Sequence, residues 1–307
     1  MAGNSTPETA ITIEEAYHPS THGARIFSCT HSPAAPWGVV LLTHGLGEHS
    51  GRYGHVIHLF AEAGIATVRF DLRGHGRSDG QRGHAASFAE LINDLSLVFH
   101  ETRARFPALP IIVYGHSLGG NLVANWALRK PLESAQIAGM VLSAPWLLLA
   151  TPPSPLKVSI IKLLSRIWPT LPIPARFRPK RLTRHRAAID AYEHDPLIHR
   201  RVSVRLASEA FDAAHWALGH AERCTMPVFG LHGLADTITS PKGTEQFCHA
   251  APNATLLLLP DLVHEPHNEP EWREVVLAIR EWIVDRLQET QGHVPRLNRP
   301  PLAENLS

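Results

Sequence analysis

The sequence predicts an α/β fold: a mostly parallel central sheet with helices on both faces and an inserted helical cap. Short, uniformly apolar runs alternate with longer segments of helical periodicity, which is typical of a parallel sheet covered on both sides. The alternation stops between residues 145 and 219, where prolines crowd and no strand-like run is evident. We therefore divide the chain into a core in two parts (1–144 and 220–290), a cap (145–219) and a flexible tail (291–307).

The elements of the first core segment follow from apolar runs and from helical spacing. Gly64 is expected to end the first helix, and Leu91, Leu95 and Phe99 recur on one face of the second. In chain order we expect a strand at 39–42, a helix at 55–63, a strand at 66–70, a helix at 88–106, a strand at 111–114, a helix at 120–128 and a strand at 139–143.

The cap and the second core segment are assigned in the same way. A long connection without structure of its own is unusual, so we interpret the cap as helical rather than as an irregular loop. We expect cap helices at 156–167 and 203–218, strands at 228–231 and 255–259, and a final helix at 271–287.

Composition excludes several classes of protein. The 307 residues include 29 basic and 28 acidic side chains, a formal net charge of +1 that gives no basic excess for nucleic acid. The 3 cysteines lack the spacing of a disulfide framework, which suits a reducing compartment. The first residues do not look like a secretory signal, and no apolar run reaches the length of a membrane span. We therefore expect a cytoplasmic protein.

The 21 histidines raise the question of a metal site. The nearest approach to a ligand motif is His-Glu-Pro-His at residues 264–267, which is not the H-E-x-x-H helix motif because Pro266 would disrupt a helix there. We therefore expect no metal and no cofactor.

The string Gly-His-Ser-Leu-Gly at residues 115–119 is the most informative motif. It follows a predicted strand and precedes a predicted helix, which is the context of a nucleophile elbow. Such a turn presents the central Ser117 at the top of a sheet beside a helix N-terminus. The alternative is a glycine-rich turn whose serine only caps the helix.

A serine nucleophile requires a histidine base and usually a carboxylate that holds the histidine. In this strand–turn–helix context the expected chain order is serine, acid, histidine. Asp236 directly follows the strand at 228–231, and His264 follows the strand at 255–259. Asp236 would otherwise stabilise a loop as an Asx-turn residue, and His267 is the competing base.

The negative charge that develops on the substrate oxygen requires two backbone donors. One is the amide of Leu118, directly after the serine. The second is expected from Leu46 in the string Thr-His-Gly-Leu-Gly at residues 43–47, which follows the first predicted strand. The alternative is that this string forms only a turn.

Taken together, the motifs resemble the α/β-hydrolases of the monoacylglycerol lipase and lysophospholipase type, which are serine aminopeptidase S33-like. The resembling strings are His-Gly-Leu-Gly-Glu-His-Ser-Gly-Arg-Tyr at 44–53, Asp-Leu-Arg-Gly-His-Gly-Arg-Ser at 71–78, Gly-His-Ser-Leu-Gly-Gly at 115–120 and Gly-Leu-Ala-Asp at 233–236, with His264 ahead of His267.

The resemblance implies a Ser117–Asp236–His264 triad and an oxyanion hole from the amides of Leu46 and Leu118. It also implies that Glu48, Arg52 and His267 form a polar pocket for the alcohol part of a monoglyceride. The alternative for Glu48 and Arg52 is an internal salt bridge that supports the oxyanion loop, and both roles are compatible.

The implied function is a serine carboxylester hydrolase that cleaves single-chain acyl esters, foremost monoacylglycerols, through an acyl-enzyme. A lysophospholipase, a broad carboxylesterase or acyltransferase, and a non-catalytic binding protein of the same fold remain as alternatives. Lys157, Lys162 and Arg166 interrupt an apolar cap helix, so we expect transient contact with a membrane surface, against the alternative of a helix that only covers the core. The sequence leaves the oligomeric state open.

Overall fold

A single twisted sheet organises the computed structural model, which describes residues 11–175 and 178–292. Its strands run in the order β1-β2-β4-β3-β5-β6-β9-β10. The pairs β1–β2 and β2–β4 are antiparallel and all other neighbours are parallel, so the predicted α/β fold is confirmed. The strands are β1 (Ile11–Pro19), β2 (Arg25–Pro33), β3 (Gly38–Thr43), β4 (Ile65–Phe70), β5 (Ile111–His116), β6 (Gly139–Ser143), β9 (Val228–Gly233) and β10 (Ala254–Leu259).

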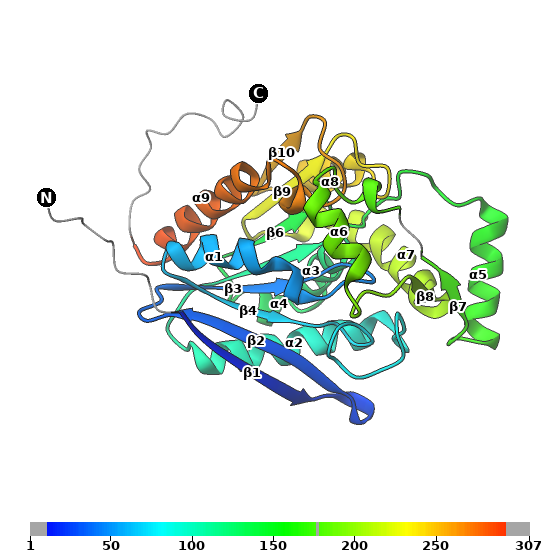
Figure 1. Ribbon diagram of the computed structural model, residues 1–307, viewed down its shortest axis with the longest axis horizontal. Helices are drawn as coiled ribbons and strands as arrows, with labels where there is room; N and C mark the ends of the chain where they lie inside the picture. The colour runs from blue at the N-terminus through cyan, green and yellow to red at the C-terminus, as the bar shows by residue number, and fades with distance from the viewer. Residues whose placement is uncertain (1–10, 176–177, 293–307) are drawn as a thin grey trace, which may run out of the picture.

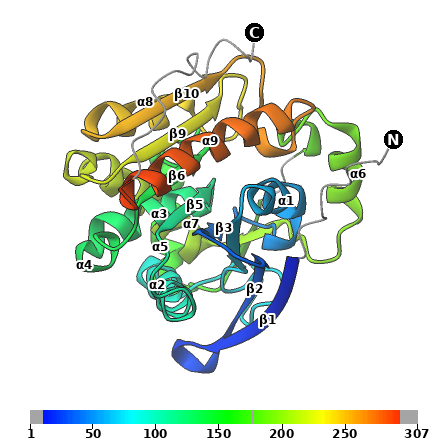
Figure 2. The same ribbon diagram turned by 90° about the vertical axis from the view of Figure 1, so that its left-hand side faces the viewer.

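Helices cover both faces of this sheet (Figures 1 and 2). One face carries α1 (Gly54–Glu62) and α9 (Trp272–Thr290). The opposite face carries α2 (Phe88–Arg105), α3 (Leu118–Arg129) and α8 (Pro241–Ala250). The remaining short elements of the core are helix α4 (Pro131–Ser134) and the 3-10 turns η1 (Thr21–Gly23), η2 (Ser50–Tyr53), η4 (Ala221–Arg223) and η5 (Pro266–Asn268).

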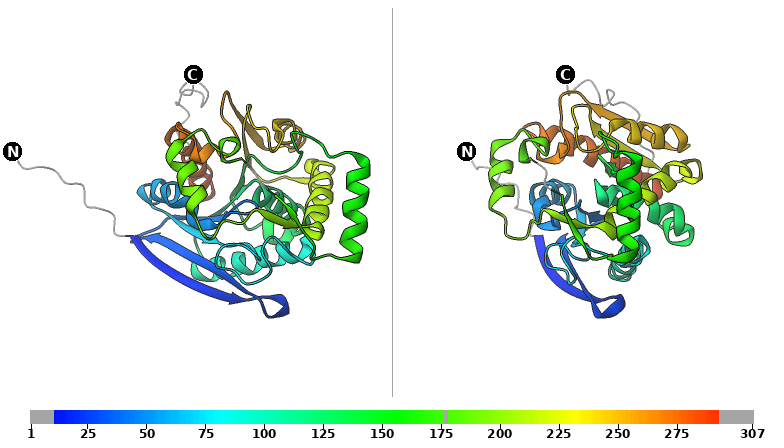
Figure 3. Two further views of the ribbon diagram at one scale, coloured as in Figure 1. Left: turned by 45° about the vertical axis from the view of Figure 1, so that its right-hand side comes forward. Right: turned by 90° about the vertical axis from the view of Figure 1, so that its right-hand side faces the viewer.

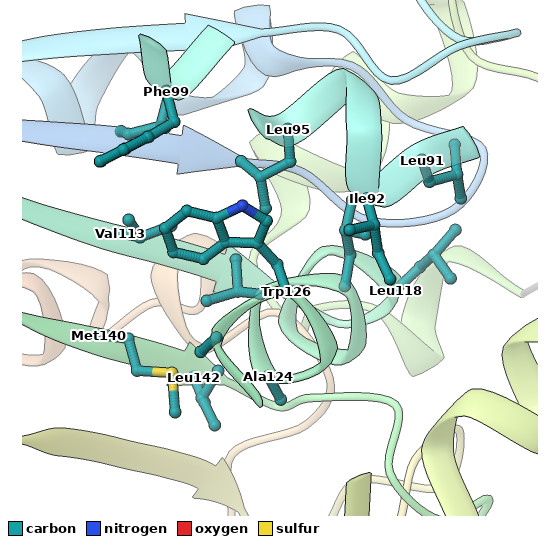
Figure 4. Close-up of a cluster of buried hydrophobic side chains, with 14 of the residues drawn as sticks. Leu91, Ile92, Leu95, Phe99, Val113, Leu118, Ala124, Trp126, Met140 and Leu142 are labelled. Atoms are coloured by element: carbon teal, nitrogen blue, oxygen red, sulfur yellow. The ribbon is translucent and has the colours of Figure 1, made fainter. Parts of the chain in front are cut away.

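The core beneath α2 and α3 is built around the fully buried Trp126 (Figure 4). Its ring centroid lies 5.2 Å from that of Phe99, and its indole N–H donates to Ser96 Oγ at 3.0 Å. Burial of a large apolar side chain contributes about 1.5–3 kcal/mol. This packing fixes α3, the helix that begins directly after Ser117.

The chain between β6 and β9 forms the cap at the carboxyl ends of the parallel strands (Figures 1 and 3). Helix α5 packs on α7, and α7 packs on α3. The two helices expected from the sequence are present, whereas α6 and a two-stranded ribbon of β7 and β8 were not predicted. The cap elements are α5 (Pro155–Ile167), β7 (Pro172–Pro174), η3 (Pro179–Arg181), α6 (Arg186–His194), β8 (Arg201–Ser203) and α7 (Val204–Leu218).

Within residues 11–175 and 178–292, no helix is both long enough and apolar enough to cross a membrane. The expectation of a loose tail at 291–307 concerns residues that lie almost wholly outside this described part.

The N-terminus of α3 lies directly against the carboxyl end of β3. A Cβ at Gly119 would stand 2.5 Å from the carbonyl oxygens of both Thr43 and His44, so only glycine fits. This contact brings the loop after β3 beside the turn that carries Ser117.

We predict that Gly119→Ala destabilises the protein by about 1–3 kcal/mol, because backbone carbonyls cannot yield as a flexible side chain would. Gly54→Ala is the matched control. Gly54 opens α1 at φ −52°, and a Cβ there would have no heavy atom within 4 Å. We expect it to be neutral or stabilising by up to about 1 kcal/mol. Urea unfolding of both variants measures the difference, and equal stabilities would contradict the steric argument.

Candidate active site

Ser117 occupies the sharp turn between β5 and α3 with φ 51° and ψ −115°, a backbone conformation that residues other than glycine rarely adopt. The surrounding backbone holds it there: its N–H donates to the Ser143 carbonyl at 3.0 Å, and its own carbonyl accepts from the Trp146 N–H at 2.8 Å. A strained residue that its surroundings fix in this way is typical of functional sites.

The structure brings Ser117, His264 and Asp236 into one hydrogen-bonded chain, although 147 residues separate the serine from the histidine. His264 Nε2 lies 3.0 Å from Ser117 Oγ, and His264 Nδ1 lies 2.7 Å from Asp236 Oδ2. Because an ionised carboxylate only accepts hydrogen bonds, Nδ1 carries the imidazole proton and Nε2 is left to accept from the serine hydroxyl. This arrangement allows His264 to act as a general base.

Asp236 is held in one orientation by several donors. Its Oδ1 accepts from the backbone N–H groups of Ile238 at 2.7 Å and Thr239 at 3.1 Å. Its Oδ2 accepts from the Thr239 hydroxyl at 2.8 Å and from His232 Nε2 at 3.1 Å, besides His264. Burial acts to raise the pKa of Asp236, but the adjacent histidines lower it on balance, so the carboxylate stays ionised.

The same pairing sets the protonation of His264. Burial acts to lower the pKa of His264, whereas the Asp236 carboxylate raises it, and the net shift is upward. The neighbouring His116 lies with its ring centroid 5.1 Å from that of His264, and burial lowers its pKa to about 4. His116 is therefore neutral near neutral pH, and of this imidazole pair only His264 is tuned to accept a proton.

The loop after β3 passes directly against the serine. A Cβ at Gly45 would lie 3.2 Å from Ser117 Cβ. The backbone of Leu46 therefore enters the site from one side, while Leu118, the first residue of α3, follows the serine on the other. Two amides at these positions suit the stabilisation of an oxyanion.

Three buried charged side chains lie beneath this loop. Glu48 Oε2 accepts from Arg52 Nη1 at 2.5 Å, and the Arg52 guanidinium donates two hydrogen bonds of 2.7 Å to the carboxylate of Glu265. Burial acts to raise the pKa of Glu48 and Glu265, but Arg52 lowers both on balance. The internal salt bridge considered for Glu48 and Arg52 is thus present.

Glu265 is the partner that sequence reasoning missed. The sequence singles it out only as part of the metal-like string at 264–267. Two properties mark Glu265 as part of the site: it directly follows His264 in the sequence, and it is only 3% exposed. The first can be read from the sequence, whereas the second is known only from the structure.

A cavity of about 440 Å³ opens onto Ser117 and His264. Glu48, His116 and Glu265 form its polar wall, while Arg52 and His267 lie behind that wall rather than on it. The rest of the lining comes from both core and cap and is mixed: apolar side chains such as Trp146, Leu149, Ile161, Ile173, Phe211 and Ile238 stand beside the basic Lys157, Lys162 and Arg181.

His267 lies in the interior behind the polar wall. Its ring stacks on Tyr53 at 4.6 Å between centroids and meets His116 edge-on at 4.8 Å. Burial lowers its pKa well below the usual value. Across the described residues we find no cluster of histidine, cysteine and carboxylate side chains that could hold a metal ion.

Comparison with known proteins places this geometry in a family. Residues 34–271 match the profile of the family described as serine aminopeptidase, S33. The chain is 33% identical over 269 residues to a monoacylglycerol lipase of Mycolicibacterium smegmatis, covering 86% of this chain and 95% of that protein. It is 34% identical over 266 residues to an uncharacterised abhydrolase domain-containing protein of Dictyostelium discoideum, of whose length it spans only 28%.

Solved structures agree with this assignment. The crystal structure of a Paleococcus ferrophilus monoacylglycerol lipase superposes with a TM-score of 0.78 at 36% identity, covering 85% of this chain and 99% of that one. The resemblance drawn from the motifs is thereby confirmed. The chain belongs to the S33 serine aminopeptidase family, as a serine ester hydrolase with the α/β-hydrolase fold.

Proposed function

We propose that this hydrolase cleaves monoacylglycerols, with Ser117 as nucleophile, His264 as base and Asp236 as the residue that orients the histidine. The observation that carries the proposal is the continuous chain of hydrogen bonds from Asp236 through His264 to Ser117 Oγ, in a cavity lined by both apolar and polar side chains. Relatives described as monoacylglycerol and monoglyceride lipases support the choice of substrate.

The apolar and polar side chains of the cavity suit the two parts of a monoacylglycerol. The apolar lining suits a single acyl chain, whose burial is favourable by about 0.8 kcal/mol per CH₂. Glu48 on the polar wall suits the glycerol hydroxyls, with Arg52 and His267 supporting that wall from behind. A polar site of this kind disfavours substrates that leave its groups unpaired.

The proposed reaction proceeds through an acyl-enzyme. His264 accepts the proton of Ser117 as Oγ attacks the ester carbonyl, and the amides of Leu46 and Leu118 donate to the oxyanion. The imidazolium, stabilised by Asp236, then protonates the departing glycerol oxygen. A water molecule, activated by the same histidine, releases the fatty acid and restores the serine.

Replacing Ser117 by alanine is expected to lower kcat roughly 10⁶-fold, because it removes the attacking atom. The stability of the variant should stay close to that of the wild type. Glycerol release from a monoacylglycerol and labelling by a fluorophosphonate probe measure the loss. Hydrolysis that persists in Ser117→Ala would contradict the assignment of the nucleophile.

The pH profile provides a second prediction. Because the pKa of His264 is raised above 6.5 and only its neutral form is a base, kcat/KM should rise with pH through an apparent pKa above 6.5. Asp236→Asn removes the charge that raises this pKa, so the acid limb should move to lower pH while kcat falls about 10⁴-fold. An unmoved acid limb in Asp236→Asn would contradict the role of Asp236.

We further propose that residues 145–219 act as a cap that contacts an anionic membrane surface through α5. The outward face of this helix and its end is apolar: Leu156, Ile160, Leu163, Ile167 and Trp168 are 48–71% exposed. Lys157, which also borders the cavity, and Arg166 are exposed on the same helix, and their charge complements an anionic lipid surface. Lys162 contributes less because it pairs with Asp212 at 2.7 Å.

Leu163→Glu with Ile167→Glu is expected to weaken binding to anionic phospholipid vesicles about tenfold or more, because two apolar contacts are lost and two like charges are added. Hydrolysis of a water-soluble ester should not change. Leu132→Glu is the matched control, since Leu132 on α4 is 85% exposed and lies outside the cap. Equal vesicle binding by all three proteins would refute the membrane contact.

A further inference from the structure

The carboxylate of Glu48 holds the oxyanion loop, residues 43–47, in place. Glu48 Oε1 accepts from the Gly45 N–H at 2.6 Å and from the Tyr53 hydroxyl at 2.9 Å. The first of these bonds holds the N–H of Gly45, the residue just before Leu46, whose amide is the proposed oxyanion donor. The position of that donor therefore depends on where the Glu48 side chain is held.

The carboxylate of Glu265 holds the loop that carries His264, the proposed base. Glu265 directly follows His264, and its Oε2 also accepts from Asn268 Nδ2 at 2.8 Å. Because the two residues are adjacent, a shift of the Glu265 backbone moves the imidazole of His264 as well.

Arg52 is bound to both carboxylates. Its Nη1 contacts Glu48 at 2.5 Å and Glu265 at 2.7 Å, and its Nη2 makes the second bond to Glu265 at 2.7 Å. The side chains of Arg52, Glu48 and Glu265 are only 9%, 5% and 3% exposed, so water screens this network little. Paired guanidinium–carboxylate bonds of this kind fix direction as well as distance.

The cap contacts the same network. The ring of Tyr192 on α6 lies under the Arg52 guanidinium at 5.2 Å, and the Glu265 N–H donates to the carbonyl of Leu182 at 2.7 Å. Arg52 is thus the point at which the oxyanion loop, the histidine loop and the cap meet.

From these contacts we propose that Arg52 is a positioning residue, which holds the Leu46 amide and the His264 imidazole at a fixed separation through Glu48 and Glu265. This inference rests on the proposed role of Ser117, His264 and Leu46 in ester cleavage, and it is distinct from recognition of the alcohol. Arg52 lies behind the cavity wall and acts through its two carboxylates rather than by touching substrate.

The test compares Arg52→Met, Arg52→Lys and Glu265→Gln in the full chain, with two substrates and a label. A short p-nitrophenyl ester has a leaving group without glycerol hydroxyls, whereas a monoacylglycerol has them. The rate of labelling by a fluorophosphonate reports the reactivity of Ser117 independently of the alcohol that either ester releases. Circular dichroism and urea unfolding establish that each variant is folded.

We expect Arg52→Met to lower kcat about 100-fold for both esters with little change in KM, since a misplacement of about 1 Å can cost this much. Labelling should slow in parallel. Arg52→Lys keeps the charge but loses the two-pronged contact, so it should fall between Arg52→Met and wild type. Glu265→Gln should slow both esters equally. If Arg52→Met does not fold, the other two variants carry the test.

A matched control is Arg25→Met, which breaks an arginine–carboxylate pair of 2.9 Å with Asp79 at the surface, where the two side chains are 62% and 37% exposed. Its kcat should equal that of the wild type. The positioning role is overturned if the Arg52 and Glu265 variants hydrolyse and label at wild-type rates, or raise KM for the monoacylglycerol alone. Failure of the proposed substrate instead appears in the wild type, as labelling without monoacylglycerol hydrolysis.

Discussion

The approach of α3 to the end of β3 is the contact on which the rest of the site depends. Because Gly119 lies against the carbonyls of Thr43 and His44, the helix can begin directly beneath the loop that follows β3. The turn before the helix then has little room, and Ser117 takes its strained backbone conformation. The same approach sets the backbone of Leu46 beside the serine. One steric fit thus positions both the proposed nucleophile and the expected oxyanion donors before any substrate arrives.

Buried charge is arranged around this turn in two separate groups. Asp236 accepts from several donors and serves the histidine directly. Glu48 and Glu265 share a single guanidinium, which leaves one negative charge in excess nearby. Both carboxylates act to raise the pKa of His264, in the same direction as Asp236. The site therefore favours the protonated form of His264, which is the form that the proposed transfer of the serine proton would produce.

Buried strands were predictable where they contain an apolar run, as at 39–42 in β3 and 111–114 in β5. The chain order of serine, acid and histidine then assigned the site residues, and the structure brings those three together. The antiparallel β1 was missed because its side chains are mostly exposed, and α6 because only Ile189 and Tyr192 are buried in it. The largely buried β2, in which polar and apolar side chains mix, and helix α8 were missed as well. Glu265 was missed as a partner because a contact across 213 residues has no local pattern.

The cap is attached to the core unevenly, and this affects how the site can admit a lipid. Its segment around α6 and β8 makes backbone hydrogen bonds with two loops of the core: the His199 N–H donates to the Gly47 carbonyl, and the Ser203 N–H donates to the Gly83 carbonyl. Helix α5 instead rests on α7, another part of the cap. Displacement of α5 alone would remove Lys157, Val158, Ile161 and Lys162 from the cavity lining, and it would leave the hydrogen bonds of His199 and Ser203 in place. The part of the insertion that would admit the acyl chain is therefore separate from the part that is bonded to the core. Substitutions in α5 would then change which acyl chains enter, while the geometry of the proposed catalytic groups is kept.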